Sequence, residues 1–211
     1  MTDSLPGWLE FAAWARDNRW TLKRTIAHDG WAMSNNAAHP GWRIEWGPAQ
    51  RSFMCGRELR IRADLPQMPD VQALVLDRAL LARLDREVYQ QITGTVQTRL
   101  DDETPEEMRW LAMHPKLSPN QMGVQLRDRY GAIGSDRDWV SGWLEGALAQ
   151  ALEERADATP IEAISTEPFV LRLARGQLVL RQAALTPGVA LLQSCLRIAL
   201  AAQDALDRVH S

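Results

Sequence analysis

The sequence predicts an α+β protein in which strands from both ends of the chain form one antiparallel sheet around a large inserted helical block. Three observations lead to this fold class. Apolar and polar residues alternate at 42–46 and 59–63, residues 170–181 have the pattern of a hairpin, and helical periodicity runs from about 70 to 155. Further helices are expected at both termini.

The chain has the length and composition of one globular domain, and we treat residues 1–211 as a single domain. It has 211 residues, of which 45% are hydrophobic and 24% charged, so it can bury a sizeable core. The predicted sheet-forming parts are residues 20–65 and 166–183. The helical block is expected at 70–155 and the C-terminal helix at 187–209.

An amphipathic helix is expected at residues 5–20. Its apolar residues Trp8, Phe11, Ala12 and Ala15 recur at helical spacing. Residues 21–27 alternate weakly, as in a strand. Residues 28–41 are polar and contain glycine and proline, which predicts a long loop or a broken hairpin.

Two strands of the first half have one apolar face each. Trp42, Ile44 and Trp46 alternate with polar residues, and so do Leu59 and Ile61. Alternation with period two is typical of antiparallel strands that are covered on one side.

The helical block is predicted from four helix-start signals. Asp70 is a good N-cap for a helix of six turns that would run to about Ile92. Thr104-Pro105 and Ser118-Pro119 each combine an N-cap with proline at the first helical position. Ser135 precedes a fourth helix, expected to continue to about residue 154.

The second group of strands is a hairpin that turns at Arg175-Gly176. The apolar runs 170–173 and 178–181 flank this pair, and glycine supplies the positive φ that a tight turn needs. Thr186-Pro187 then starts the last helix.

Charge and composition favour an acidic bacterial protein of the cytoplasm. The net charge is −3, which does not favour a nucleic-acid partner. Residues 1–7 lack the features of a signal peptide, and the apolar tract 189–202 is too short and too polar to span a membrane. Only Lys23 and Lys116 are lysines, so 22 of the 24 basic residues are arginine, as in GC-rich genomes. Two cysteines are expected to be reduced.

Motifs for metals, cofactors and nucleophiles are missing from the sequence. The histidines and cysteines do not have metal-ligand spacing, and no glycine-rich phosphate loop occurs, so we predict neither metal, cofactor nor catalytic residues. Cys55 lies near Arg57, which could favour the thiolate, but burial as a small apolar residue is the simpler interpretation. Cys195 is expected in the core. The acidic residues of 101–107 are interpreted as a helix N-terminus, with a general base pair or divalent-cation binding as the alternatives.

An arginine stripe marks the first group of strands. Arg60 and Arg62 share the sheet face opposite Leu59 and Ile61, and Arg43 is expected across from them. The stripe could bind a phosphate backbone or an acidic protein. Since Glu45, Glu58 and Asp64 share the neighbourhood and can neutralise it, we favour a solvated face with cross-strand ion pairs.

Tryptophan is unusually abundant, with nine residues in the chain and six of them in the first 46. Trp42 and Trp46 are expected in the core. Trp31 lies in the polar stretch and is a candidate for a pocket or an interface. Gly142 and Gly146 flank Trp143 in a predicted helix, and we expect a close approach of another element there. The ligand or interface candidates are Trp31, His28, His39, Cys55, Arg60, Arg62, Trp139 and Trp143.

The leading functional hypothesis is a non-catalytic protein-interaction module that forms a homodimer or binds another protein. The element order and the acidity are loosely similar to the type III secretion chaperones, which are small acidic α+β dimers, although the helical block departs from that group. The alternative is a ligand-binding protein or enzyme, with a pocket between sheet and helices near Trp31 and the loop from His28 to His39. The third hypothesis is nucleic-acid binding through Arg43, Arg60 and Arg62.

Overall fold

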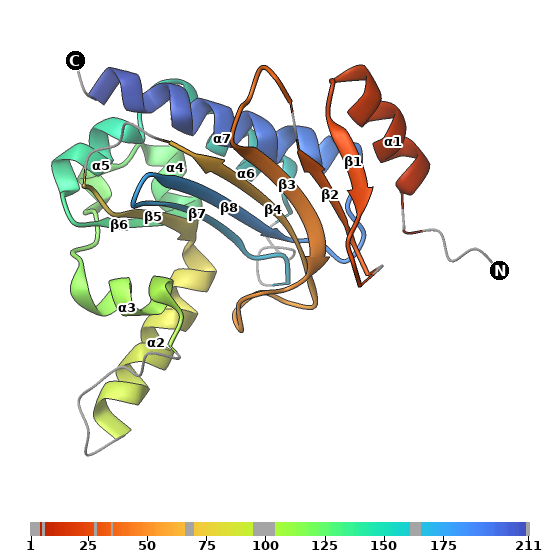
Figure 1. The fold of residues 1–211 in the computed structure, drawn as a ribbon. Helices are drawn as coiled ribbons and strands as arrows, with labels where there is room; N and C mark the ends of the chain where they lie inside the picture. Colours follow the sequence, from red (N-terminus) through yellow and green to blue (C-terminus); the bar gives the residue numbers. More distant parts are fainter. Residues whose placement is uncertain are drawn as a thin grey trace.

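The computed structural model describes residues 5, 7–27, 29–34, 36–65, 70–94, 104–160 and 166–209. These residues form an eight-stranded sheet in the order β1-β2-β3-β4-β8-β7-β5-β6, and every pairing is antiparallel (Figure 1). Helices lie at both ends of the chain. The predicted α+β class is therefore confirmed.

The bounds of the elements are as follows. The strands are β1 (Thr21–Arg24), β2 (Trp31–Ser34), β3 (Trp42–Pro48), β4 (Arg57–Asp64), β5 (Ala73–Asp77), β6 (Tyr130–Gly134), β7 (Phe169–Ala174) and β8 (Gln177–Ala183). The helices are α1 (Trp8–Asp17), α2 (Arg78–Gly94), α3 (Glu106–Met113), α4 (Val124–Arg129), α5 (Arg137–Trp143), α6 (Ala147–Ala158) and α7 (Val189–Val209), with a 3-10 turn, η1, at Pro119–Gln121.

The predicted strands at 42–46 and 59–63 and the predicted hairpin are confirmed as β3, β4 and β7–β8. In the hairpin, Ala174 pairs with Gln177, and the two turn residues Arg175 and Gly176 have φ of 51° and 70°. Positive φ at both central residues is the signature of a type I′ turn, whose twist matches that of the strands.

The predicted helix from Asp70 is wrong over its first turns, because residues 73–77 form strand β5. All five residues of β5 are buried, with Val75 facing one side of the sheet and Leu74 and Leu76 the other. A strand covered on both sides has a continuous apolar run, which periodicity does not distinguish from a buried helix. Residues 130–134 form a second strand within the block, β6, which we did not predict.

Of the two alternatives predicted for residues 28–41, the long loop is wrong and the broken hairpin agrees with the structure, because β2 lies there and pairs with β1 and β3. Trp31 pairs with Trp46 of β3, and Met33 pairs with Ile44. Both β2 residues have no exposed surface. Strand β2 has only four residues, too few to produce a clear alternation among polar neighbours.

The predicted helix after Ser135 is two helices, α5 and α6, separated at Gly146. Gly146 has a φ of 62°, and a Cβ atom there would lie 2.8 Å from Nη1 of Arg208. Gly142 differs, since a Cβ atom there would meet nothing within 4 Å. The expected close approach is thus wrong at Gly142, and Gly146 is needed where the chain changes direction between two helices.

The helix starts agree only partly with the predicted caps. At η1, Oε1 of Gln121 accepts a hydrogen bond from the Ser118 backbone N–H at 3.0 Å. Helix α5 is capped by Asp136 rather than Ser135, through hydrogen bonds from the N–H groups of residues 138 and 139 at 3.0 Å. Helix α3 begins at Glu106 without a side-chain cap from Thr104.

One side of the sheet is apolar across all eight strands. A single row of paired residues crosses it from β1 to β6: Leu22, Met33, Ile44, Ile61, Leu180, Leu171, Val75 and Ala132. Helices α1, α5, α6 and α7 contribute residues to the core on this side, and Figure 1 shows α7 lying across the sheet. We call it the helix side.

Helix α7 is the core helix of this layer. By length and composition it is also the one helix of the described chain that is apolar enough to cross a membrane, a property that core helices share. Eight of its residues are buried, among them Leu192, Cys195 and Ile198. In this fold the apolar surface of α7 therefore packs on the sheet.

The opposite side of the sheet is covered over only one half. Helices α2 and α3 extend from the body on this side (Figure 1), and with Phe53 and Met54 of the β3–β4 loop they cover β5, β6, β7 and part of β8. No helix in the described part of the chain packs on the remaining half. We call this surface the open half-face; it consists of Thr21, Lys23, Ala32, Ser34, Arg43, Glu45 and Arg62.

Candidate functional site

The boundary between the covered and the open half is a row of charged residues. Directly paired residues on this side are, from β1 to β6, Lys23, Ala32, Glu45, Arg60, Arg181, Val170, Leu76 and Gly131. The row is charged or small as far as β8 and apolar or small beyond it. The same sheet therefore presents a core surface at one end and an ionic surface at the other.

Two arginines face each other at the centre of this row, and a buried carboxylate neutralises them. Arg60 of β4 pairs directly with Arg181 of β8. Oε1 of Glu58 accepts hydrogen bonds from Nη1 of Arg60 at 2.5 Å and from Nη1 of Arg181 at 2.6 Å. Glu58 has no exposed surface. Like charges opposite each other destabilise a sheet, and Glu58 removes that repulsion.

A second pair of arginines lies beside the first on the open half-face. Arg43 of β3 pairs directly with Arg62 of β4. Nη2 of Arg43 lies 2.6 Å from Oε1 of Glu45, whose other oxygen accepts from Nη2 of Arg60 at 2.9 Å. Arg62 is exposed and has no hydrogen-bond or ion-pair partner among the described residues. This pair therefore has one carboxylate, which is shared with the buried pair.

The electrostatics of the two pairs follow their burial. Burial lowers the pKa of Arg181 to about 10, although the charge of Glu58 opposes the shift. Burial also acts to raise the pKa of Glu45, but the hydrogen bonds from Arg60 and Arg43 outweigh it and lower the pKa. The open half-face has the formal positive charges of Lys23, Arg43 and Arg62 against the negative charges of Glu45 and the neighbouring Asp64, so its formal net charge is positive.

A cavity of about 360 Å³ lies over the second arginine pair. Arg43, Glu45 and Arg62 line it together with Gln50, Gly41 and Asp64. The guanidinium groups and carboxylates give this cavity donors and acceptors for a polar ligand. We call it the arginine pocket.

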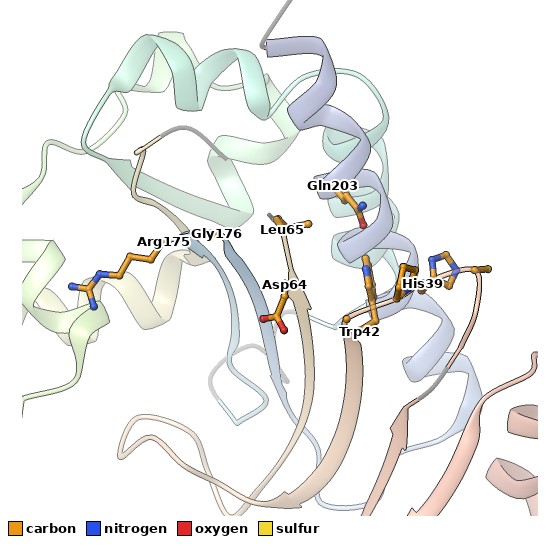
Figure 2. Close-up of a pocket in the computed structure, with 10 residues that line it drawn as sticks. His39, Trp42, Asp64, Leu65, Arg175, Gly176 and Gln203 are labelled. Carbon is orange, nitrogen blue, oxygen red and sulfur yellow. The ribbon is translucent and has the colours of Figure 1, made fainter. Parts of the chain in front are cut away.

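A larger cavity, of about 660 Å³, lies at the ends of the same strands. It is lined by residues 38–42, 64–65 and 175–176 and by Gln203 of α7. Figure 2 shows Gln203 on α7 near Trp42 and His39, whereas the side chain of Arg175 extends away from them. We call this cavity the strand-end pocket. It shares Gly41 and Asp64 with the arginine pocket, so the two are contiguous.

Backbone hydrogen bonds hold the walls of the strand-end pocket in place. The N–H of Leu65 donates to Gly176 O at 2.7 Å, and the N–H of Trp42 donates to His39 O at 3.2 Å. The His39 ring stacks on Trp20 with centroids 6.1 Å apart and lies 5.4 Å from the Trp42 ring. The pocket is therefore preformed, as most ligand pockets are.

The loop candidates do not converge on one cavity. Trp31 is buried in the core on the helix side, where its ring centroid lies 4.6 Å from that of Phe11. His39 lines the strand-end pocket, at the opposite end of β3 from the partner of Trp31. Cys55 is exposed in the β3–β4 loop, so burial of this thiol is a wrong prediction. His28 lies outside the described residues.

The remaining candidates are divided between core and surface. Trp143 is buried and donates its indole N–H to Ala202 O at 2.8 Å, and Trp139 stacks on it with centroids 6.0 Å apart. Arg60 is buried, so the expected solvated face is wrong at this residue, while Arg62 is exposed. The expected cross-strand ion pair is present between Glu45 and Arg60.

Arg181 and Gln203 were not among the candidates from sequence, and Asp64 was named only as a charge that can neutralise the arginine stripe. Arg181 follows the apolar run 178–180, and alternation from Val179 could have placed it on the side of Arg60. Gln203 has no local signal, because the pocket that it lines with Asp64 forms only where α7 crosses the strand ends.

Other chemical candidates have structural partners. Glu107 pairs with Arg51 at 2.9 Å, and Glu106 pairs with Arg172. Residues 101–103 of the acidic cluster lie outside the described residues. Burial raises the pKa of Cys195 to about 12, so this thiol stays protonated. Among the described residues no group of three or more potential metal ligands occurs.

A second buried ionic cluster lies on the helix side, where α6 contacts the sheet. Nη1 of Arg155 lies 3.1 Å from Oδ1 of Asp77, and Oδ2 of Asp77 accepts from the Phe169 N–H at 2.7 Å. The charge of Asp77 raises the pKa of Arg155 against the effect of burial. Every charge in this cluster is matched internally, so it fixes α6 on the sheet.

Comparison with known proteins gives only distant structural likenesses. No protein-family model and no curated protein matches the chain. The crystal structure of the mycobacterial trehalose monomycolate transport factor A, TtfA, is similar over 93% of this chain and 92% of that chain, with a TM-score of 0.47 and 10% sequence identity. A likeness this distant carries no functional argument.

Proposed function

We propose that this protein is a non-catalytic interaction module that binds an acidic segment of a partner protein on the open half-face. The observation that carries the proposal is the difference between the two arginine pairs. Arg60 and Arg181 are neutralised by the buried Glu58, whereas Glu45 pairs with Arg43 and Arg60 and leaves Arg62 without an ion-pair partner among the described residues. A carboxylate from a partner would do for Arg62 what Glu58 does for Arg181.

The chemistry of the site favours carboxylates as ligands. A guanidinium group donates two parallel hydrogen bonds to a carboxylate, and such charge-assisted pairs are among the strongest in proteins. Arginine is also enriched among the residues that dominate binding energy at protein interfaces. Because Arg62 is exposed and unpaired within the described residues, it can bind a partner without breaking an internal ion pair.

The mixture of charges favours a protein over a nucleic acid. Glu45 and Asp64 lie beside the arginines in the arginine pocket, where they repel any anion. They disfavour a nucleic acid, which has a phosphate at every residue, more than a peptide whose carboxylates are separated by neutral residues, because the two carboxylates can accept hydrogen bonds from the peptide N–H groups. The net charge of the whole chain, −3, also opposes approach to a polyanion. An acidic protein segment, with alternating donors and carboxylates, fits this surface better.

The proposal is tested with a fluorescent peptide of alternating glutamate and serine, whose anisotropy reports binding. We expect binding that weakens as salt is raised, and a loss of affinity of about tenfold or more in Arg43→Glu/Arg62→Glu, because two attractive charges become repulsive. Arg137→Glu is the matched control, since Arg137 is an exposed arginine in α5 and lies outside the open half-face. It should bind as the unaltered protein does.

Three results would overturn the proposal. The first is equal binding by Arg43→Glu/Arg62→Glu and the control. The second is preference for a single-stranded oligonucleotide over the acidic peptide. The third is a light-scattering measurement that gives a homodimer whose assembly is disrupted by the double substitution, because the open half-face would then be a self-association surface.

A further inference from the structure

We infer that the strand-end pocket is an anchor site for a bulky apolar side chain of the same acidic segment, about two residues away from its acidic group. This inference rests on the proposed function. It assigns a binding role to the larger of the two contiguous cavities and a sequence pattern to the partner.

The two cavities lie along one strand end and share a wall. Gly41 and Asp64 line both, so the two cavities meet at these two residues. Gly41 precedes Arg43 by two residues along the chain. An extended segment rises about 3.3 Å per residue. A partner segment that runs along β3 would therefore cover the interval from Gly41 to Arg43 with about two of its own residues.

The strand-end pocket has the chemistry of an anchor site. Its volume of about 660 Å³ exceeds that of any one side chain, and Trp42, Pro40 and Leu65 give it an apolar lining. Its polar lining residues are His39, Asp64, Arg175 and Gln203, of which His39 and Gln203 can hydrogen-bond a tryptophan or tyrosine ring. Interfaces with this design commonly use a buried aromatic anchor beside a charged pair.

The lining of the pocket is held in place before any ligand arrives. His39 is stacked on Trp20, and Asn36 holds the same loop through hydrogen bonds from its Nδ2 to Asn18 O at 2.9 Å and from the Ala38 N–H to its Oδ1 at 2.8 Å. The Arg175–Gly176 turn is tied to Leu65. A preformed pocket loses little conformational entropy when a ligand fills it. Most of the free energy of the new contacts therefore contributes to the affinity.

The test compares three peptides of equal length and charge. The first carries a tryptophan two residues from a glutamate pair, the second has serine in place of the tryptophan, and the third has the tryptophan at the far end. We expect the first to bind about tenfold or more tightly than the second, with the third close to the second.

Matched substitutions locate the anchor. Ala38→Trp places a large side chain at the mouth of the pocket and should reduce the effect of the peptide tryptophan to less than about twofold. Ala37→Trp is the control, because Ala37 is an exposed alanine one residue away that does not line the pocket. Gln203→Trp fills the same pocket from α7, so a folding defect in one variant does not decide the result.

The outcomes separate this inference from the proposed function. If the glutamate peptides bind through Arg43 and Arg62 but the tryptophan has no effect, the anchor is overturned and the proposed function stands. If no peptide binds the unaltered protein, both are overturned. If the tryptophan effect persists in both Ala38→Trp and Gln203→Trp, the anchor lies elsewhere and the assignment of this pocket is wrong.

Discussion

The two sides of the sheet differ in how far residues of the same chain cover them and pair their charges. On the helix side, a row of eight residues is apolar from β1 to β6, and helices of the same chain cover it. On the other side, the chain supplies a cover for β5 to β8 and leaves the ionic surface of β1 to β4 open. The helix side is complete within the monomer, whereas the open half-face has an unmatched charge at Arg62.

This comparison separates residues that stabilise the fold from residues that are available for binding. Trp31 and Arg62 were both candidates for an interface, and they lie on opposite sides of the sheet. Trp31 is inaccessible, so any effect of changing it acts through stability. Arg62 is exposed, so a change there should alter stability little and, under the proposed function, should act mainly on binding. The predictions below test this separation, in order of expected effect.

The largest effect is expected on the helix side, from Trp31→Ala. This substitution removes a fully buried indole that packs against Phe11, and it should lower the free energy of unfolding by about 3–5 kcal/mol. Urea denaturation measures the change. Trp31→Phe should cost much less, because the indole N–H has no hydrogen-bond partner among the described residues. A loss below about 1 kcal/mol for Trp31→Ala would contradict the placement of Trp31 in the core.

The next effect tests the boundary between the two halves. Glu58→Gln removes the charge that neutralises Arg60 and Arg181 but keeps an acceptor oxygen. We expect a loss of about 2–4 kcal/mol, because the buried Arg181 would lose its carboxylate and face Arg60, which would keep only its ion pair with Glu45. Glu145→Gln, at an exposed position between α5 and α6, is the control and should change stability by less than about 0.5 kcal/mol.

A triple substitution sharpens this result. Replacing Glu58 by leucine and both arginines by methionine should recover most of the stability lost in Glu58→Gln, since apolar residues of similar size often replace buried ion groups without loss. If the triple variant is as unstable as Glu58→Gln, the arginines have a packing role that is independent of their charge.

The parts of the fold that were predictable from sequence are those in which the pattern of polar and apolar residues matches the burial of each residue. Strand β3 alternates because one side faces the core and the other the open half-face, and the β7–β8 turn is marked by glycine. Strand β5 was misread as a helix because both of its sides are buried, and β6 was missed. Burial on both sides removes the alternation that identifies a strand.

The candidate site was predictable only in part, for a similar reason. Arg60 and Arg62 were placed on one side of the sheet by their spacing along one strand. The pairing of Arg60 with Arg181 joins residues more than a hundred positions apart, and it follows from the strand order β4-β8. Trp31 lay in a strand too short to show a period. The strand order and the crossing of α7 over the sheet depend on the whole fold. The residue pattern within one segment does not predict them.

The smallest change in stability, with the opposite sign, is expected from Arg62→Glu on the open half-face. Arg43 lies directly across from residue 62, so the substitution replaces a like-charge pair by an attractive one. We expect a gain in the free energy of unfolding of about 0.2–1 kcal/mol that decreases with added salt. Arg62→Gln, which removes the repulsion without adding attraction, should give a smaller gain.

The same substitution should weaken binding of the glutamate peptide, so stability and affinity should move in opposite directions. A residue kept at the expense of stability is typical of a functional site, because the free chain gains from its replacement while the complex loses. If Arg62→Glu instead lowers the free energy of unfolding by more than about 1 kcal/mol, Arg62 stabilises the fold. The two sides of the sheet would then differ in composition alone, and the partner carboxylate would have no unmatched charge to meet.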